Sequence, residues 1–326
     1  MSSLSQTYNA ALKQVAVIAL PQRTHVQITG SDRATFLHNF CTQQIKSLAV
    51  GQGAEAFVTN IKGRILFHGV VYAGTDSLWF EAVPGLAETL IAHLDRYLIS
   101  EDVQLVDRTN DLMQVYWSGP QAAASLAALL RETLPELTEP GQFVTDKGAL
   151  VRQFSMGLAA GYSVVAPPEM ARELLVAAER AGLPQGTEAL FELLRIEAGY
   201  PHSGVDITDD HLAQEASRTQ RAINFNKGCY LGQEPIARLD ALGHVNRAFA
   251  GIETTEPVAL PLGTEVFATV DASAAAGVLT SVTTHPITGR SLGLGMLKKA
   301  LLVPDGPCYV GPSRIPGRVH LWEAPH

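Results

Sequence analysis

The sequence is poor in cysteine and in charge, and it has no long apolar run. Of its 326 residues, three are cysteines and 17% are charged, against 46% hydrophobic. Cys41, Cys229 and Cys308 are too few and too far apart for a disulfide framework, and they form no C-x-x-C pair. We therefore expect a reducing, cytoplasmic location. No run approaches the ~18 apolar residues of a membrane span, and the hydrophobic content excludes a disordered chain.

Basic residues are also scarce. Twenty-four Lys and Arg stand against 32 Asp and Glu, a net charge of −8. A chain this acidic is a poor general binder of nucleic acid. We therefore expect no direct tRNA binding and no membrane partner. The apolar residues 15–20 follow a single lysine and lead into Pro21 without a small-residue cleavage site, so we expect no signal peptide.

Several common functional motifs are missing. The sequence has no G-x-G-x-x-G fingerprint, no Walker loop and no G-x-S-x-G elbow. Its ten histidines form no H-x-x-x-H pair, and its aspartates do not match a calcium loop. We therefore predict no nucleotide fingerprint, no serine-hydrolase elbow and no metal site.

The pattern of strand-like and helix-like runs changes along the chain. Up to about residue 243, strand-like runs such as residues 55–59 and 64–72 alternate with helix-like runs such as 168–181 and 186–198. From residue 248 onward, short β-like runs are divided by Pro and Gly, which is typical of a small antiparallel barrel. The pattern predicts an α+β fold with two domains, 1–243 and 244–326.

One segment, residues 226–234, stands apart because two glycines flank a cysteine. The glycines, Gly228 and Gly232, indicate tight turns or close approach by another group. A cation near a thiol favours the nucleophilic thiolate, so Cys229 is a candidate reactive thiol and Lys227 its activator. The alternative is that Cys229 is a small buried hydrophobe and Lys227 a surface charge.

A second feature is a local excess of basic residues. Between positions 218 and 247 five basic residues face only two acidic ones. The five are Arg218, Arg221, Lys227, Arg238 and Arg247. A basic island in an acidic protein attracts an anionic ligand, although scattered charges on a solvated loop give the same count.

A third feature is Glu197, which ends a predicted helix among apolar residues. A carboxylate in such a setting is costly unless it is paired. Glu197 either pairs with an arginine or accepts hydrogen bonds from a ligand whose adjacent N–H groups satisfy both oxygens.

These residues resemble a known family. The run Lys227, Gly228, Cys229, Tyr230, Leu231, Gly232, Gln233, Glu234 matches the K-G-C-Y-x-G-Q-E signature of the YgfZ family, which is related to the glycine-cleavage T-protein aminomethyltransferase. Four further segments resemble patterns of these proteins: residues 32–41, 61–65, 195–206 and 283–294. Together they cover most of the chain.

The resemblance implies a fold and a ligand. The fold is two interwoven α+β domains and a C-terminal antiparallel β-barrel around a central opening. The ligand is tetrahydrofolate, with Glu197 reading the pterin and Arg238 and Arg195 serving the rest of the folate site. The implied function is a folate-binding accessory protein in iron–sulfur cluster assembly or repair that supports tRNA modification, with iron–sulfur client proteins as partners. We expect a monomer.

One departure separates the relatives. In the aminomethyltransferase a catalytic Asp follows the hairpin, but residues 65–71 of this chain contain no carboxylate and place His68 there. Loss of a general acid–base group typically costs 10²–10⁴-fold in rate. The resemblance therefore favours the accessory role, with a folate-dependent aminomethyltransferase or one-carbon transferase as the alternative.

Overall fold

The computed structural model describes residues 3–20 and 22–323 and divides the chain into two compact units. Unit 1 consists of Met1–Val58, Phe67–Phe191 and Arg221–Leu231. Unit 2 consists of Thr59–Leu66, Glu192–Gln220 and Gly232–His326. Because the chain passes between the units several times, each unit is described by itself.

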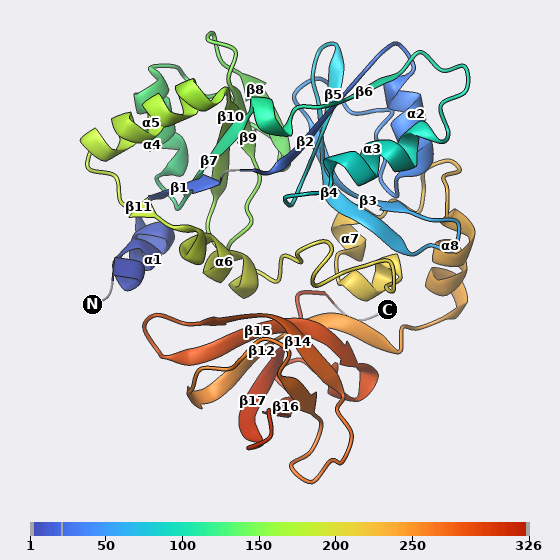
Figure 1. The fold of residues 1–326 in the computed structure, drawn as a ribbon, viewed down its shortest axis with the longest axis vertical. Helices are drawn as coiled ribbons and strands as arrows, with labels where there is room; N and C mark the ends of the chain where they lie inside the picture. Colours follow the sequence, from blue (N-terminus) through green and yellow to red (C-terminus); the bar gives the residue numbers. More distant parts are fainter. Residues whose placement is uncertain (1–2, 21, 324–326) are drawn as a thin grey trace. The chain divides into compact units, whose positions relative to one another are not determined.

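Unit 1 is built on two β-sheets (Figure 1). The first has six strands, in spatial order β11 (Gln185–Gly186), β1 (Ala16–Leu20), β7 (Met113–Ser118), β10 (Gly161–Ala166), β9 (Leu150–Gln153) and β8 (Gly141–Val144). The second has five, in spatial order β3 (Gly53–Thr59), β4 (Ile65–Ala73), β5 (Ser77–Ala82), β2 (Thr24–Thr29) and β6 (Gln104–Asp107). Apart from the parallel β1–β11 pair, the neighbouring strands whose direction is resolved are antiparallel, as expected for an α+β fold.

Helices cover these sheets. They are α1 (Ser3–Lys13), α2 (Arg33–Phe40), α3 (Ala87–Asp95), α4 (Ala122–Leu130) and α5 (Pro168–Arg180). Helices α4 and α5 contact β7 and β10 (Figure 1). Trp117, Val115, Val164, Leu126 and Leu174 form part of the core beneath them, because α5 repeats apolar residues at helical spacing and buries that face.

Unit 2 is dominated by a closed barrel of six strands. Around the barrel they are β12 (Arg247–Pro257), β15 (Arg290–Lys298), β14 (Gly277–Thr284), β13 (Glu265–Phe267), β16 (Pro307–Val310) and β17 (Ile315–His320). All of the pairings are antiparallel. Closure removes free strand edges, so these short strands pair on both sides.

The end of helix α6 (Glu188–Glu197) packs on this barrel. Ile196 joins Phe249 and Leu294 in one buried cluster. Gly199 ends the helix with φ +65°, and a Cβ there would lie 2.2 Å from the Trp322 ring. Glycine is therefore needed at this turn for both conformation and space.

The expected fold class is confirmed, and so is the C-terminal barrel. Strands β3 and β4 cover the predicted strand-like runs 55–59 and 64–72 almost completely, and helix α5 covers almost all of residues 168–181. Two helices were not predicted: α7 (Thr219–Ala222) and α8 (Gln233–Leu242). The boundary predicted between residues 243 and 244 falls between α8 and β12, inside unit 2, and it stays a prediction.

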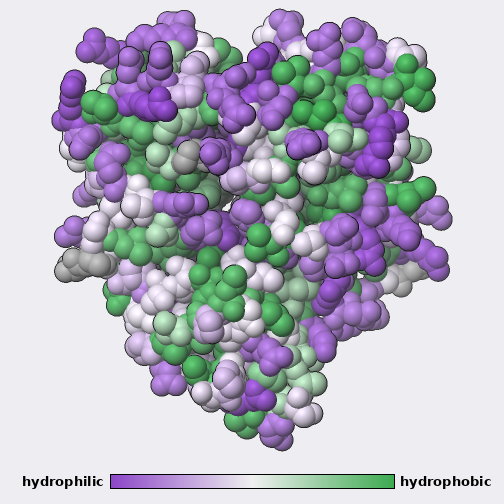
Figure 2. All heavy atoms as spheres, in the orientation of Figure 1, coloured by the Kyte–Doolittle hydropathy of each residue, from purple (hydrophilic) through white to green (hydrophobic). Residues whose placement is uncertain are grey.

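The surface drawn in Figure 2 mixes hydrophilic and hydrophobic residues. Large exposed apolar side chains occur singly, often in turns; examples are Ile61, Ile99, Leu158 and Leu262. Single exposed apolar side chains are ordinary in proteins and need no functional explanation. In the part of the chain that is described, no helix is both long and apolar enough to cross a membrane.

Candidate functional site

The cysteine-containing loop is anchored in unit 1 by Lys227. Its ammonium donates three hydrogen bonds to backbone carbonyl oxygens, those of His38 (2.6 Å), Cys41 (2.7 Å) and Gln43 (2.9 Å). These carbonyls lie at and just beyond the end of α2. A lysine ammonium has three N–H donors, so all of them are used to hold the loop against the end of this helix.

Burial lowers the pKa of Lys227 to about 8, and the nearby Cys41 thiol opposes that shift. The Lys227 ammonium also lies 4.8 Å from the centre of the Tyr230 ring. Conversely, burial raises the pKa of Cys41, and Lys227 lowers it in part. The contacts of Lys227 therefore anchor the cysteine loop to the end of α2. Its predicted activation of Cys229 stays a prediction.

Cys229 itself is exposed, whereas Cys41 and Cys308 are buried. The interpretation of Cys229 as a small buried hydrophobe is therefore wrong, and a partner can reach its thiol. Lys227 in turn is buried and is not a surface charge.

The two glycines of the motif differ. Gly232 has φ +86°, and a Cβ there would lie 2.3 Å from the Asn60 carbonyl oxygen, which confirms the predicted close approach. A Cβ at Gly228 would meet only His38 Nε2, at 4.0 Å, so nothing steric requires glycine there. Gly232 precedes α8, whose first turn contains Gln233 and the exposed Glu234, a favourable place for a negative charge.

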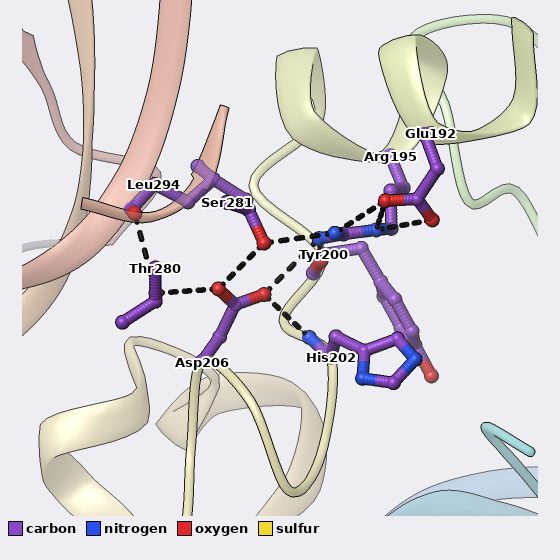
Figure 3. A network of polar contacts seen from close by, with 8 residues as sticks. All are labelled: Glu192, Arg195, Tyr200, His202, Asp206, Thr280, Ser281 and Leu294. Carbon is purple, nitrogen blue, oxygen red and sulfur yellow. Dashed lines mark hydrogen bonds and ion pairs between the residues drawn. The ribbon is translucent and has the colours of Figure 1, made fainter. Parts of the chain in front are cut away.

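In unit 2, Arg195 is the centre of a buried hydrogen-bond network (Figure 3). Its Nε and Nη2 donate to the Glu192 carboxylate at 2.6–2.9 Å, and Nη2 also donates to Ser281 Oγ at 2.8 Å. Its Nη1 donates to the Tyr200 carbonyl at 3.2 Å and to Asp206 Oδ2 at 3.1 Å. These contacts use all five N–H groups of the guanidinium.

Asp206 completes this network. It is fully buried and also accepts hydrogen bonds from Thr280 Oγ1 (2.6 Å), Ser281 Oγ (2.7 Å) and the backbone N–H of His202 (2.8 Å). The network ties α6, the loop after it and strand β14 together (Figure 3). The N–H groups of Arg195 all have partners within the protein, and its predicted role in the folate site stays a prediction.

Glu197 lies two residues further along α6 and takes a different partner. Its Oε1 lies 3.7 Å from His285 Nε2, and the Glu197 side chain is 11% exposed. His285 Nδ1 accepts the backbone N–H groups of Ile287 and Thr288, both at 3.2 Å. The proton of this ring is thereby placed on Nε2, facing the carboxylate.

Three of the five residues of the predicted basic island already have partners within the protein. Arg218 is buried with its guanidinium 5.3 Å from the Tyr200 ring centre, Lys227 is buried, and Arg247 donates to Glu215 at 3.0 Å. Only Arg221, in unit 1, and Arg238, on α8 of unit 2, are exposed. The count of charges therefore overstated the basic surface.

Unit 1 contains a cavity of about 530 Å³ that the sequence did not predict. Its lining includes Gln43, Gln44, Glu55, Phe154 and Arg221. The volume lies in the range of small-molecule sites. Gln43 connects this cavity to the cysteine loop, because it lines the cavity and its carbonyl accepts a hydrogen bond from the Lys227 ammonium.

A buried glutamate–histidine pair lies at this cavity. Glu55 lines it, and His68 Nε2 lies 2.7 Å from Glu55 Oε1, with both side chains about 98% buried. The absence of a carboxylate from residues 65–71 thus does not leave His68 without one, because β3 supplies Glu55. A charged residue in the apolar run of residues 54–58 was the signal that could have found it.

Among the described residues, no group of three or more His, Cys, Asp or Glu side chains is arranged to hold a metal ion.

Residues 2–227 match the family model described as the GCVT N-terminal domain. The chain is 28% identical over 237 residues to the tRNA-modifying protein YgfZ of Yersinia pestis, covering 72% of this chain and 69% of that one. It is 26% identical over 302 residues to a chloroplastic protein of Arabidopsis thaliana whose name describes a transferase, covering 87% of this chain and 66% of that one.

Among solved structures, the aminomethyltransferase T of the glycine cleavage system from Bartonella henselae superposes with a TM-score of 0.87. The superposition covers 97% of this chain and 88% of that one, at 19% sequence identity, and it shows a shared fold. The resemblance to YgfZ and the T-protein is thereby confirmed, and the chain belongs to the GCVT N-terminal domain family.

Proposed function

We propose that this protein is a folate-binding accessory protein of the YgfZ kind that supports the assembly or repair of iron–sulfur clusters and, through them, tRNA modification in the cytoplasm. The observation that carries the proposal is the exposed Cys229 on a loop fixed by three hydrogen bonds from Lys227. A fixed, accessible thiol can meet a partner protein in one orientation, at a lower entropic cost than a mobile one.

The residues present fit tetrahydrofolate in part. Glu197 is a largely buried carboxylate that lies 3.7 Å from His285 Nε2, and it can accept the adjacent N–H groups of a pterin ring. The exposed Arg238 can meet the carboxylates of the glutamate tail. Folate, when bound, would supply a one-carbon carrier, while the chain's own residues bind and orient it.

Cys229 contributes one sulfur ligand at most. Iron–sulfur clusters usually take about four protein ligands, so the thiolate, after losing its proton to solvent, would join a cluster whose other ligands belong to the client. Clusters are therefore cargo in this proposal.

Calorimetry with tetrahydrofolate tests the ligand. We expect the wild type to bind and Glu197→Ala to bind at least about tenfold more weakly, since hydrogen bonds to a charged group are lost. Glu256→Gln, an exposed glutamate of β12, is the matched control. Equal affinity of wild type and Glu197→Ala would remove Glu197 from the folate site.

Complementation tests the thiol. In a strain that lacks its own protein of this kind, wild type should restore an iron–sulfur-dependent tRNA modification and Cys229→Ala should not. Asn226→Ala, an exposed neighbour in the same loop, should restore it as wild type does. Full restoration by Cys229→Ala would contradict the role of the thiol.

One observation supports a second candidate, a folate-dependent one-carbon transferase. The Glu55–His68 pair gives unit 1 a buried acid–base couple at a cavity. It does so although the position expected for a catalytic Asp carries no carboxylate. This candidate predicts turnover of tetrahydrofolate with a methylamine-type donor, and the absence of any folate-dependent product from the purified protein would exclude it.

A further inference from the structure

Two segments of unit 1 meet around the exposed thiol, residues 38–50 and residues 221–231. The backbone N–H of Asn224 donates to the Thr42 carbonyl at 2.9 Å. Lys227 adds its three hydrogen bonds to carbonyls of the first segment. The two segments are therefore held together, and we call their exposed side the thiol face.

The charged residues of the thiol face are all positive. Residues 38–50 and 221–231 contain three basic residues and neither aspartate nor glutamate. Lys227 is buried, which leaves Lys46 and Arg221 exposed. In the part of the chain that is described, neither of these two side chains has an ion-pair partner. Cations without partners attract an anionic group from outside.

Two carboxylates from other segments lie beside Arg221, because Glu55 and Glu139 line the cavity of unit 1 together with it. Both are already engaged within the protein. Glu55 Oε1 lies 2.7 Å from His68 Nε2, and Glu139 Oε1 accepts the backbone N–H of Ser155 at 2.8 Å. The charge of Arg221 is therefore still available to an acidic group.

Lys46 is connected to the thiol through His38. Burial, together with the charges of Lys227 and Lys46, lowers the pKa of the His38 imidazole, so Lys46 lies near this ring. His38 Nε2 in turn lies 4.0 Å from the position that a Cβ at Gly228 would take, one residue before Cys229. The cation and the exposed thiol therefore share a small area of the surface.

Phe225 adds an aromatic side chain to this loop. It is 37% exposed, and Asn226, Gly228 and Cys229 are exposed beside it in the chain. A single exposed apolar side chain needs no explanation. An aromatic side chain among cations, however, is typical of the residues that anchor protein–protein interfaces.

We propose that the thiol face binds an acidic segment of a partner protein, with carboxylates of the partner against Lys46 and Arg221 and an apolar side chain against Phe225. The inference rests on the proposed function and deepens it, because it states the chemistry of the surface that brings a partner to Cys229. A protein fits better than RNA. RNA presents a long row of phosphates, which a chain of net charge −8 repels, whereas a short acidic segment needs only local cations.

Thiol exchange with charged peptides tests the inference on the full chain. Three synthetic peptides share one leucine and one cysteine, which is activated as its mixed disulfide with thionitrobenzoate, and are flanked by glutamates, glutamines or lysines. The Cys229 thiolate attacks the peptide sulfur, a disulfide forms between the two, and thionitrobenzoate leaves with the electron pair of the broken bond. At low salt the glutamate peptide should react at least about tenfold faster than the lysine peptide, and added salt should reduce this ratio. Equal rates would overturn the inference.

Variants locate the charge preference. Lys46→Gln combined with Arg221→Gln should reduce the ratio of the two rates to about threefold or less. The ratio cancels any change in the reactivity of the thiol that is common to the peptides. Lys147→Gln combined with Arg172→Gln removes two exposed cations elsewhere in unit 1 and should keep the wild-type ratio. An unchanged ratio in the first double variant overturns the inference.

Phe225→Ala tests the apolar contact. It should slow the exchange of all three peptides alike, because the contact with their shared leucine does not depend on charge. Rates equal to those of the wild type would contradict the contact with Phe225.

Competition distinguishes a protein partner from RNA. At equal concentration of charge and physiological ionic strength, poly-L-glutamate should slow the exchange of the glutamate peptide more than polyuridylate does. Stronger inhibition by polyuridylate that is lost in the Lys46→Gln variant would assign the thiol face to RNA and overturn the inference.

Complementation separates this inference from the proposed function. If Cys229→Ala fails to restore the tRNA modification while the three peptides react at equal rates, the proposed function stands and the inference is overturned. If Cys229→Ala restores the modification fully while the ratio of rates depends on Lys46 and Arg221, the proposed role of the thiol fails and the preference of the thiol face for acidic segments stands.

Discussion

Each unit contains a buried arginine, and the two are satisfied in different ways. Arg195 of unit 2 uses all five N–H groups in hydrogen bonds to Glu192, Tyr200, Asp206 and Ser281. Arg152 of unit 1 is fully buried, yet in the described part of the chain its Nη2 has no hydrogen-bond partner.

Aromatic rings replace part of the hydrogen bonding of Arg152. Its guanidinium carbon lies 4.5 Å from the ring centre of Tyr72 and 5.7 Å from that of Trp79, and Nη1 donates to Glu81 Oε2 at 2.7 Å. The ring faces supply cation–π attraction. The network in unit 2 therefore fixes one arrangement of three segments through hydrogen bonds, whereas in unit 1 Arg152 joins strands of two sheets with ring contacts in place of some hydrogen bonds.

The largest effect should come from Arg195→Met. This change leaves the Asp206 carboxylate buried without its cation, which typically costs about 3–5 kcal/mol of the free energy of unfolding. Denaturant unfolding measures it. Arg290→Met, which removes an exposed pair with Glu253, is the control and should cost at most about 1 kcal/mol. A loss as small as that of the control would show that the network is dispensable.

Arg152→Met should cost less, about 2 kcal/mol. The Glu81 carboxylate keeps Gln114 Nε2 at 2.9 Å and Arg23 Nη2 at 3.8 Å, and the methionine side chain can still pack against the aromatic rings. The same unfolding experiment applies. A loss larger than that of Arg195→Met would reverse the comparison between the two units.

Acid should destabilise the buried group of unit 1 that contains Arg152, because this group includes His25 and Glu81. Burial, opposed in part by Glu81, lowers the pKa of His25 from 6.5 to about 3. Despite the opposing effect of burial, Arg152 and its neighbours lower the pKa of Glu81 to about 2. Both groups bind a proton more readily in the unfolded chain, so stability falls as the pH drops from 6.5 toward 3 and from 4.5 toward 2, respectively.

His25→Gln tests this sign. The wild type should lose up to about 1.4 kcal/mol per pH unit more than the variant between pH 6 and pH 4, since one proton is involved. Parallel curves for wild type and His25→Gln would mean that His25 is charged in the folded protein.

The smallest effect on stability should come from Cys229→Ser, within about 0.5 kcal/mol, because the side chain is exposed. The same change should abolish rapid labelling of the native protein by a thiol reagent. Burial raises the pKa of Cys308 to about 12 and also raises that of Cys41, so neither should label before unfolding. Rapid labelling of the serine variant would show that a buried thiol is reachable.

Much of the fold could be predicted from local patterns. Turn residues between short β-like runs predict the barrel strands, and the motif glycine Gly232 stands where a side chain would clash with the Asn60 carbonyl. Charge counting was less informative, because Arg218 and Lys227 turn out to be buried. A side chain's charge is fixed by its type, but its burial depends on what packs around it.

The sequence by itself determined the alternation of strands and helices, the antiparallel barrel at the C-terminal end, and the identity of the motif around Cys229. Only the tertiary structure decided that the Lys227 ammonium anchors its loop by hydrogen bonds and that the N–H groups of Arg195 all have partners. It also decided that Glu55 pairs with His68 beside a cavity. The physical reason is range: propensity and periodicity act between residues a few positions apart, whereas hydrogen-bond partners and burial are set by segments that meet only when the chain has folded.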